Sequence, residues 1–200
     1  EWRDVSLAVA LCTGRRMAEV HCSGQFRIID DYTVGFTGQL KGKEAVVYFD
    51  RNGLRQRCSK DDFLKMRRLG QLPSEAKYIP IGDFELQIPT LVEAELVTAG
   101  VEWLEANKKR LPRKEDPERV NRRWSKVLNK RAKLWDFLPE GENMTYHRTR
   151  AGYVAAHLNN ANVKLFDYLT QIRWILGDND EATIRAYQRY EIKPGTVTKI

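Results

Sequence analysis

Residues 25–50 contain three short segments in which β-branched and aromatic side chains are concentrated. These segments cover residues 26–29, 33–37 and 45–49, and they are separated by Asp30-Asp31 and by Lys41-Gly42-Lys43. Segments of this length and composition are typical of β-strands, and Asp and Gly favour turns. Because short connections join neighbouring antiparallel strands, we expect residues 25–50 to form one small antiparallel sheet.

The rest of the chain has the apolar spacing of helices. Helices are expected over residues 5–11, 15–20, 61–68, 90–107, 119–135, 149–158 and 163–176, with a short last helix after Asp180. Thr90 is expected to cap the fourth of these with Glu93, and Gly14 and Gly177 are expected to end the first and the seventh. The proline-containing segments 72–74 and 88–90 are expected to be loops. The sequence therefore predicts an α+β fold, mainly α: a helical bundle with a small antiparallel β-sheet near the N-terminus.

The chain is long enough to form a domain with a substantial core, because 42% of its 200 residues are hydrophobic. We expect residues 1–200 to form a single domain. The chain begins at Glu1 rather than at methionine, and residues 195–200 form a tail without a capping pattern. We therefore expect it to be a fragment of a longer multidomain protein.

Positive charge is concentrated in one part of the chain. The net charge is +7, and residues 108–133 hold twelve Lys or Arg against three acidic residues. Such a basic stretch is either a solvated face of two helices or a surface that follows a phosphate backbone. We favour the second interpretation, because basic side chains outnumber the local acids that could pair with them. The expected DNA contacts are Lys43, Arg122, Arg123, Lys126, Lys130 and Arg148.

The sequence gives no sign of a metal site, a disulfide framework or a membrane span. The three cysteines include no Cys-x-x-Cys pair, and the three histidines have no zinc-ligand spacing. No apolar run is long enough to cross a bilayer. We therefore expect reduced thiols, no cofactor, no membrane partner and a cytoplasmic location.

Cutting DNA without a metal ion requires a particular set of side chains. The attacked phosphate gains negative charge, so guanidinium groups must bind its oxygens in a fixed geometry. A nucleophile must form a reversible phosphoester, and the leaving 5′-oxygen needs a proton. A minimal set is two arginines, an acid such as lysine, and a tyrosine. The sequence supplies candidates in the order Arg16, Lys41, His147, Arg150, Asp178 and Tyr187.

The order of the motifs resembles that of the tyrosine recombinase superfamily. Thr13-Gly-Arg-Arg-Met-Ala-Glu19 resembles the first box, T-G-x-R-x-x-E, and His147-x-x-Arg150 resembles the second, H-x-x-R. Between them lie a sheet with a lysine turn at Lys41, the segment 88–91, which is similar to the family's I-P-L segment, and the helix segment 121–128 of the N-x-x-x-S type. Leu176-Gly-Asp178 followed by Tyr187 is similar to L-G-H followed by the nucleophilic tyrosine. The resemblance covers nearly the whole chain.

Within the superfamily, the sequence is most similar to the telomere resolvases, or protelomerases. The double arginine of the first box and the 25-residue gap from Arg16 to Lys41 carry this likeness. It implies the recombinase catalytic-domain fold and a dimer that cuts double-stranded DNA at a palindromic site. Tyr187 would form a 3′-phosphotyrosyl bond, and each end would be sealed as a hairpin. The enzyme would act in a bacterial cell on phage or plasmid DNA.

The resemblance also implies a role for each matching residue. Arg16 and Arg150 would bind the non-bridging oxygens, and Lys41 would protonate the leaving 5′-hydroxyl. His147 would support proton transfer or bind the phosphate. Asp178 departs from the pattern, because an ionised carboxylate cannot donate to a phosphate. Glu19 is expected to be structural.

Several alternatives stay open. Arg15 competes with Arg16, Arg148 with Arg150, and Tyr190 with Tyr187, although the box spacing favours the second of each pair. At the level of function, a strand-exchanging integrase or a topoisomerase of the same chemistry would use the same first cut. A basic DNA-binding domain with a degenerate site is the third alternative, and Asp178 is the residue that supports it.

Overall fold

The computed structural model describes residues 1–40, 42, 44–113, 115–135, 142–160 and 175–176, with side chains described up to His157 in the last helix and again at 175–176. Four of the proposed site residues, Lys41, Lys43, Asp178 and Tyr187, lie outside the described residues. The short helix expected after Asp180 also lies outside them, as does the helix expected over 163–176 except for Ile175 and Leu176, which are helical.

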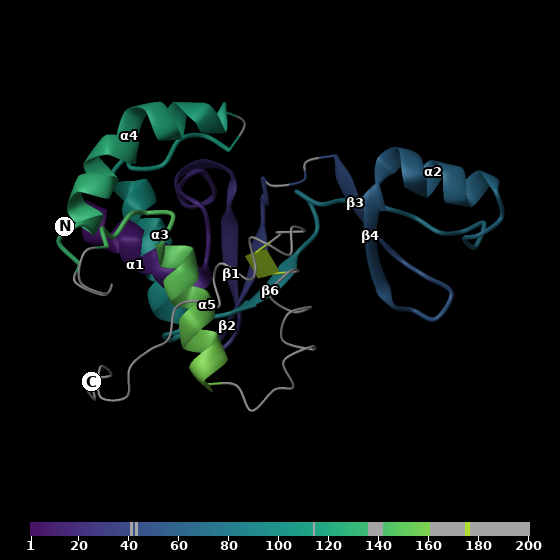
Figure 1. Cartoon of the computed structure of the whole chain (residues 1–200), viewed down its shortest axis with the longest axis horizontal. Helices are drawn as coiled ribbons and strands as arrows, with labels where there is room; N and C mark the ends of the chain where they lie inside the picture. Colours follow the sequence, from purple (N-terminus) through teal and green to yellow (C-terminus); the bar gives the residue numbers. More distant parts are fainter. Residues whose placement is uncertain (41, 43, 114, 136–141, 161–174, 177–200) are drawn as a thin grey trace.

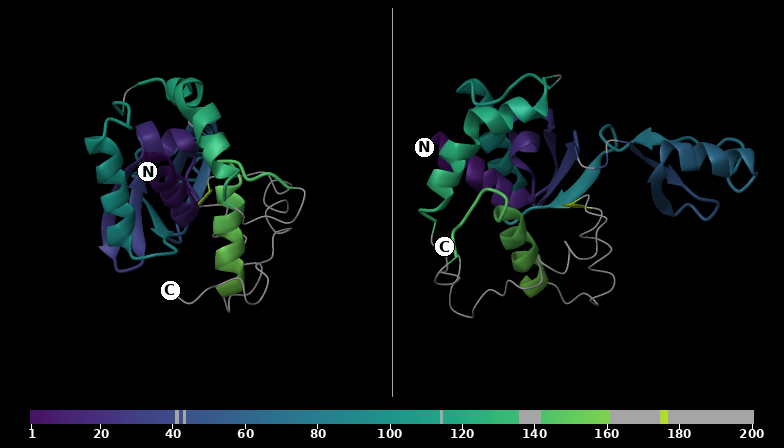
Figure 2. Two further views of the ribbon diagram at one scale, coloured as in Figure 1. Left: turned by 90° about the vertical axis from the view of Figure 1, so that its left-hand side faces the viewer. Right: turned by 45° about the horizontal axis from the view of Figure 1, so that its top comes forward.

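A bundle of helices forms the main body of the molecule (Figures 1 and 2). Helix α1 (Trp2–Thr13) contacts α3 (Ala94–Ala106), α4 (Pro117–Ala132) and α5 (Thr149–Asn160). As expected, α1 ends at Gly14, which is left-handed with φ 66°. A Cβ atom there would come within 2.7 Å of the Tyr153 ring, so this turn requires glycine both for its backbone and for its packing.

The body also contains a three-stranded antiparallel sheet in the order β1-β2-β6. Its strands are β1 (Gln25–Asp30), β2 (Thr33–Thr37) and β6 (Leu86–Pro89). Val34 of β2 pairs with Ile88 of β6, and both side chains are fully buried. The prediction of a loop at 88–90 was therefore wrong. Pro89 misled it, but this proline stands at the end of the strand, where its missing N–H is tolerated.

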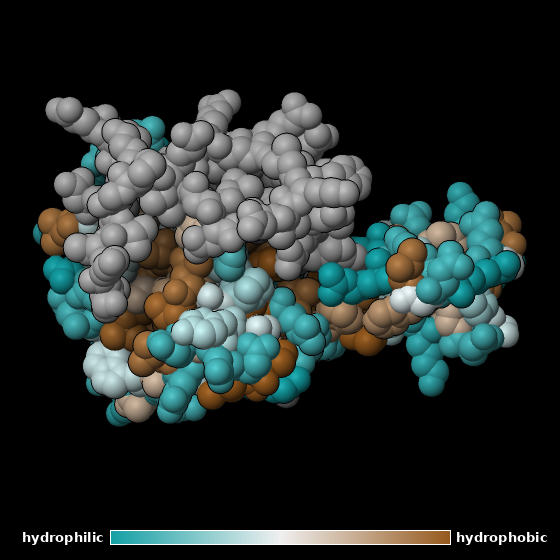
Figure 3. Space-filling view, turned by 90° about the horizontal axis from the view of Figure 1, so that it is seen from below, coloured by the Kyte–Doolittle hydropathy of each residue, from teal (hydrophilic) through white to brown (hydrophobic). Residues whose placement is uncertain are grey.

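A second sheet projects from the body as an arm (Figure 1). The arm consists of β3 (Ala45–Phe49), β4 (Arg55–Ser59), α2 (Lys60–Arg68) and β5 (Ile79–Pro80), with strand order β4-β3-β5. Its own small core contains Val46, Tyr48, Phe63 and Leu72. On the face seen in Figure 3 the arm carries mainly hydrophilic side chains.

The arm corrects the prediction of one sheet over residues 25–50. β3 does not pair with β2, because β6 occupies that edge of β2. β2 and β3 therefore belong to different sheets and do not form the expected hairpin. β4 was missed because its sequence, Arg-Gln-Arg-Cys-Ser, lacks the apolar alternation of a strand.

Two helix starts also differ from the prediction. Arg15 and Arg16 are not helical; the helical turn begins at Met17 and continues as a π-helix, Glu19–Ser23. The π-turn is closed by the bond from the Gly24 N–H to the Glu19 carbonyl. α3 begins at Ala94, not at residue 90, and Glu93 occupies its N-cap without a side-chain bond. The capping box failed because the Thr90 hydroxyl donates to the Val92 carbonyl at 2.6 Å.

The remaining described helices agree with the sequence. α2 starts after Ser59, whose hydroxyl accepts the Asp62 N–H, and it ends at Arg68 as expected. α4 starts at Pro117, two residues before the predicted start at Arg119, because Asp116 caps it by accepting the Glu118 N–H and Pro117 fills the first position. It ends three residues before Trp135, the predicted end. α5 begins at Thr149 as predicted.

Candidate active site

The two arginines of the first box follow the Gly14 turn and differ in burial. The Arg15 side chain is completely buried, donates to the backbone carbonyls of Thr13 and Ile175, and lies 4.8 Å from the centroid of the Phe36 ring. Burial lowers the pKa of Arg15 to about 10, so its guanidinium stays charged at neutral pH. Arg15 is thus part of the core of the body.

The Arg16 side chain is half-buried instead. It is 23% exposed, and one guanidinium nitrogen lies 3.6 Å from Oε1 of Glu19. The Arg16 carbonyl accepts the Val20 N–H, while the Arg16 N–H donates to Oε2 of Glu19 at 2.9 Å. This is the reciprocal half of a capping box, in which a glutamate three residues on returns to the N-cap N–H. The local sequence therefore fixes Arg16 at the N-cap of the helical turn that begins at Met17.

Glu19 holds this region together. It is fully buried and also accepts the Leu40 N–H at 3.2 Å. Burial alone would raise the pKa of Glu19, but the charges of three neighbouring arginines and the Arg16 N–H outweigh it and hold the pKa below its usual value. In order of effect these arginines are Arg15, Arg150 and Arg16. The expectation that Glu19 is structural stays a prediction that this geometry supports.

Arg150, on α5, approaches the same cluster from the other side. Its guanidinium is buried and donates to the Gly14 carbonyl at 2.7 Å and to the Leu176 carbonyl at 3.0 Å. The structure therefore brings the arginines of both boxes together around Glu19. It also places Arg150 directly against Leu176, which precedes Gly177 and Asp178 in the sequence.

A cleft of about 390 Å³ opens beside Arg16. Its lining residues come from the first box, from α4 and from the turn before α5: Arg16, Met17, Asn121, Ser125, Asn129, Thr145, Tyr146 and His147. His147 is exposed there. Two of the proposed catalytic residues, which are far apart in sequence, thus share one concave surface, as expected of an active site. A volume of this size falls within the range of about 300–1,000 Å³ that is common for ligand sites.

A buried polar network supports the His147 side of the cleft. The neighbouring Tyr146 contacts Ser6 through its hydroxyl, at 3.1 Å from both the Ser6 carbonyl and the Ser6 hydroxyl. The Nδ1–H of His21 donates to the Lys109 carbonyl at 2.5 Å, so its Nε2 accepts the Ser6 hydroxyl at 2.6 Å. Burial lowers the pKa of His21 to about 4 and keeps this ring neutral. Sequence reasoning did not identify this network, because nothing in the spacing of 6, 21 and 146 connects them.

The proposed DNA contacts of α4 form an exposed basic face. Arg122, Arg123, Lys126 and Lys130 are all exposed. Arg122 pairs with Asp116 at 3.1 Å, and the Arg123 guanidinium lies 5.2 Å from the Trp124 ring centroid. Arg148 is half-buried and bonds to Glu142 and to the Asn143 carbonyl. Lys126 and Lys130 are therefore the members of the set whose charge is most available to a phosphate.

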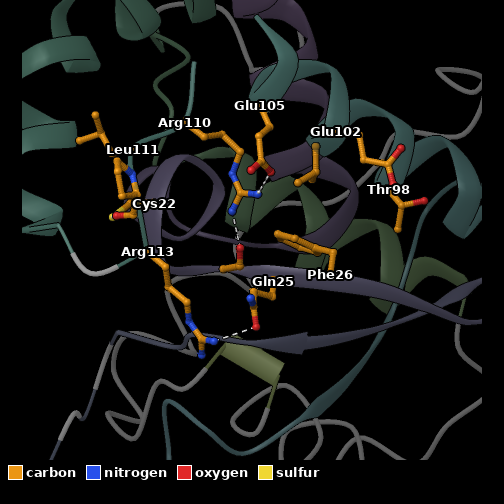
Figure 4. A pocket seen from close by; sticks show the side chains of 12 residues that line it. Cys22, Gln25, Phe26, Thr98, Glu102, Glu105, Arg110, Leu111 and Arg113 are labelled. Atoms are coloured by element: carbon orange, nitrogen blue, oxygen red, sulfur yellow. Dashed lines mark hydrogen bonds and ion pairs between the residues drawn. The ribbon is translucent and has the colours of Figure 1, made fainter. Parts of the chain in front are cut away.

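A larger hollow of about 590 Å³ lies elsewhere, between the start of β1, α3 and residues 110–113 (Figure 4). Its arginines already have internal partners. Arg110 donates to the carbonyls of Val20 and Gly24 and pairs with Glu105. Arg113 bonds to the Gln25 side chain. Of the proposed catalytic residues that the structure describes, Arg16, His147 and Arg150, none lines this hollow.

Neither a metal nor a membrane site is found in the part of the chain that the structure describes. No group of three or more His, Cys, Asp or Glu side chains in it is placed to hold a metal ion. No helix in the described ranges is long and apolar enough to cross a membrane.

Comparison with known protein families shows to which family the chain belongs. The model of the telomere resolvase ResT/TelK catalytic domain matches residues 1–190, which include every residue of the proposed site. The chain belongs to this family. The resemblance seen in the sequence is therefore confirmed.

Solved protelomerase structures share the fold. The chain is similar to protelomerase TelA covalently complexed with substrate DNA, at 17% identity and a TM-score of 0.66, covering 96% of this chain and 54% of that one. It is similar to a TelA variant complexed with a DNA hairpin product, at 17% identity and a TM-score of 0.66, with 95% and 53% covered. It is also similar to protelomerase TelK complexed with substrate DNA, at 22% identity and a TM-score of 0.61, covering 91% of this chain and 30% of that one. No curated protein sequence matches the chain.

These likenesses confirm the predicted recombinase-type fold of this family. The chain spans about half the length of the TelA chains and less than a third of the TelK chain. The fold is thus that of a catalytic domain, and the expectation that residues 1–200 are one part of a larger protein stays a prediction.

Proposed function

We propose that the protein resolves replicated, palindromic DNA ends into covalently closed hairpins by cutting and rejoining one phosphodiester in each strand. The family match over residues 1–190 carries this proposal. Two further observations support it: Arg16 and His147 share a cleft, and TelA is found covalently complexed with substrate DNA and, as a variant, with a hairpin product.

In the proposed mechanism Tyr187 attacks the scissile phosphate and loses its phenolic proton. The bond from phosphorus to the 5′-oxygen breaks, and Lys41 gives a proton to that oxygen. His147 either accepts the phenolic proton or donates to a phosphate oxygen. The 5′-hydroxyl of the complementary strand then loses its proton and attacks the phosphotyrosine. The bond from phosphorus to the Tyr187 oxygen breaks, the phenol regains a proton, and the two strands are joined as a hairpin. The covalent intermediate conserves the phosphoester energy, so the reaction needs neither a nucleotide nor a metal ion.

Arg16 and Arg150 stabilise the charge that develops on the phosphate. Arg16 is already at the cleft surface, whereas Arg150 lies behind the Gly14 turn with one nitrogen on the Leu176 carbonyl. We propose that Arg150 exchanges this carbonyl for a phosphate oxygen when DNA binds. Glu19 keeps both guanidiniums at fixed positions, so that the site is organised before DNA arrives.

The proposed partner is double-stranded DNA, bound by a homodimer on a palindromic site, in the cytoplasm of a bacterium and on phage or plasmid DNA. The exposed cations of α4, Lys126 and Lys130 above all, support the DNA contact. A symmetric site fits a dimer, because each protomer meets the same sequence.

A non-catalytic DNA-binding domain is the second candidate, because Asp178 stands where the family pattern has histidine. A strand-exchanging integrase would share the first cut. The test is to incubate the full-length protein with one palindromic duplex from the replicon that encodes it, and to run the products on a denaturing gel. We expect two hairpin products, each running as a single strand of twice the half-site length. Strands joined to a second duplex would indicate an integrase, and intact but bound DNA would contradict any catalytic function.

A further inference from the structure

Helix α4 presents three different faces. Its buried face consists of Val120, Trp124, Leu128 and Ala132. Its basic face carries the exposed cations described above. Between them runs a stripe of uncharged polar residues, Asn121, Ser125 and Asn129, which follow one another at intervals of four and therefore lie in one row along the helix. All three of these side chains line the cleft that contains Arg16 and His147.

The three polar residues of this stripe are in different situations. Asn129 already has a hydrogen-bond partner within the protein, because its Oδ1 accepts the Tyr146 N–H at 2.8 Å. This bond holds Tyr146, the residue next to His147. Ser125 is half-buried in the cleft. Asn121 is exposed, and its amide makes one long contact, 3.4 Å, to Glu118. Asn121 and Ser125 therefore offer an amide and a hydroxyl to whatever enters the cleft.

We propose that Asn121 and Ser125 form a binding site for backbone oxygens of the DNA strand that is cut, next to the attacked phosphate. This inference rests on the proposed function, because it takes the cleft to be the place where the strand lies. On α4 the polar stripe lies between the exposed lysines and the buried face, and it lines the cleft that contains Arg16. A strand that contacts both the lysines and Arg16 therefore crosses the stripe. Asn129 acts as a positioning residue for Tyr146 and His147.

The use of uncharged donors has a physical consequence. A lysine or arginine on a phosphate releases counterions, so its contribution to affinity falls as salt rises. An amide or hydroxyl on the same backbone fixes the register of the strand without adding to the salt dependence. The stripe would therefore set the position of the strand in the cleft, whereas the basic face would supply the salt-dependent affinity.

The test measures binding in the full-length Tyr187→Phe protein, which holds the strand without cutting it. The probe is the palindromic duplex, with single phosphates around the cleavage position replaced one at a time by uncharged methylphosphonate. Ser125→Ala and Asn121→Ala are compared with Ser125→Thr, which keeps the hydroxyl. Lys126→Ala represents the basic face, and Ser74→Ala, an exposed serine of the arm, is the matched control. Dissociation constants are measured over a salt series, and thermal melting checks the fold of each variant.

We expect Ser125→Ala and Asn121→Ala each to weaken binding by roughly tenfold with the salt slope unchanged. Ser125→Thr and Ser74→Ala should bind as the parent does, and Lys126→Ala should lower the slope by about one. At one phosphate, the methylphosphonate should weaken DNA binding by the parent much more than binding by Ser125→Ala or Asn121→Ala, because these two variants have already lost the contact to that phosphate.

Parent-like binding by both alanine variants would overturn the inference, as would additive losses at every phosphate. Both outcomes are independent of catalysis. Failure of the proposed function would instead appear as absence of hairpin products from the protein that retains Tyr187, whatever the binding data show. Failure of the parent to bind the duplex at all would overturn both.

Discussion

The carboxylate of Glu19 accepts a hydrogen bond from the backbone N–H of Leu40 at 3.2 Å. Its other oxygen accepts the N–H of Arg16. One buried side chain therefore ties Arg16 to Leu40, three residues after the end of β2. The first box and the segment that follows β2 are linked through this carboxylate.

Replacing Glu19 should unfold the site as well as inactivate it. Glu19→Gln removes the charge that compensates the surrounding guanidiniums, and the loss of one partner from such a buried cluster costs about 3–5 kcal/mol. We expect the free energy of unfolding in urea to fall by about that amount. Glu102→Gln, at an exposed glutamate of α3, should leave it unchanged. Equal stability of Glu19→Gln and the parent would contradict the structural role.

The pH dependence of the same residue has a defined sign. Because the pKa of Glu19 in the folded protein lies below its usual value of 4.5, its stabilising effect is complete above that pH. This stabilising effect is lost as the pH falls below 4.5 and through the lower pKa of Glu19 in the folded protein. Urea unfolding of the parent and Glu19→Gln from neutral pH to about pH 4 should show the difference between them shrinking in acid. A difference that grows in acid would show that the pKa is raised instead.

His21 gives a second pH effect at higher pH. Its pKa falls from 6.5 to about 4 in the folded protein, so the unfolded chain binds more protons between these values. Stability is therefore fully present above pH 6.5 and declines toward pH 4, by about 3 kcal/mol at most. In His21→Asn the decline should be smaller, with a remainder from His157, whose pKa burial also lowers. An unchanged pH profile in His21→Asn would rule out this assignment.

The two first-box arginines should behave in different ways. Arg15→Ala removes a fully buried cation that contacts the backbone of Ile175 and Thr13, so a loss of about 3–5 kcal/mol in unfolding free energy is expected. Arg16→Ala removes a half-buried partner of Glu19 but keeps the backbone N–H bond, so a smaller loss of stability than in Arg15→Ala is expected, together with loss of strand cutting. Measuring stability and cutting on both variants tests the choice of Arg16. Retained cutting by Arg16→Ala would transfer the role to another residue.

The basic face of α4 should determine how binding responds to salt. Removing Lys126 and Lys130 together should reduce the slope of log affinity against log salt by about two. Arg131→Ala is the matched control on the same helix. Its guanidinium is bound to Asp4 through two contacts, at 2.7 and 2.8 Å, so its loss should leave the slope unchanged. Equal slopes for the parent and the double variant would place the DNA elsewhere.

The sequence was informative where structure is local. The Gly14 helix end and the α2 and α5 starts depend on neighbouring residues, and all were predicted correctly. The pairing of β2 with β6 depends on contacts more than 50 residues apart in sequence, between Val34 and Ile88, and no local pattern reveals it. The arm was missed for another reason: β4, with the sequence Arg-Gln-Arg-Cys-Ser, lacks the apolar alternation of a strand.

The site shows the same division. The spacing of the boxes selected Arg16 and His147, which the fold brings into one cleft. The sequence could not show that Arg15 and Arg150 are buried around Glu19, because that depends on how α1, α5 and the Gly14 turn pack. Nor could it show the polar network of Ser6, His21 and Tyr146, whose members meet only in the folded body.

Trapping the covalent intermediate tests the central claim most directly. The full-length protein is incubated with its palindromic duplex nicked near the cleavage position, so that the short cut product diffuses away, and the mixture is run on a denaturing gel. The account predicts a slowly migrating protein–DNA adduct for the parent and for Tyr190→Phe, and none for Tyr187→Phe. An adduct lost only in Tyr190→Phe would move the nucleophile to Tyr190, three residues further along the sequence. No adduct from any version, with the DNA still bound, would contradict the enzymatic function.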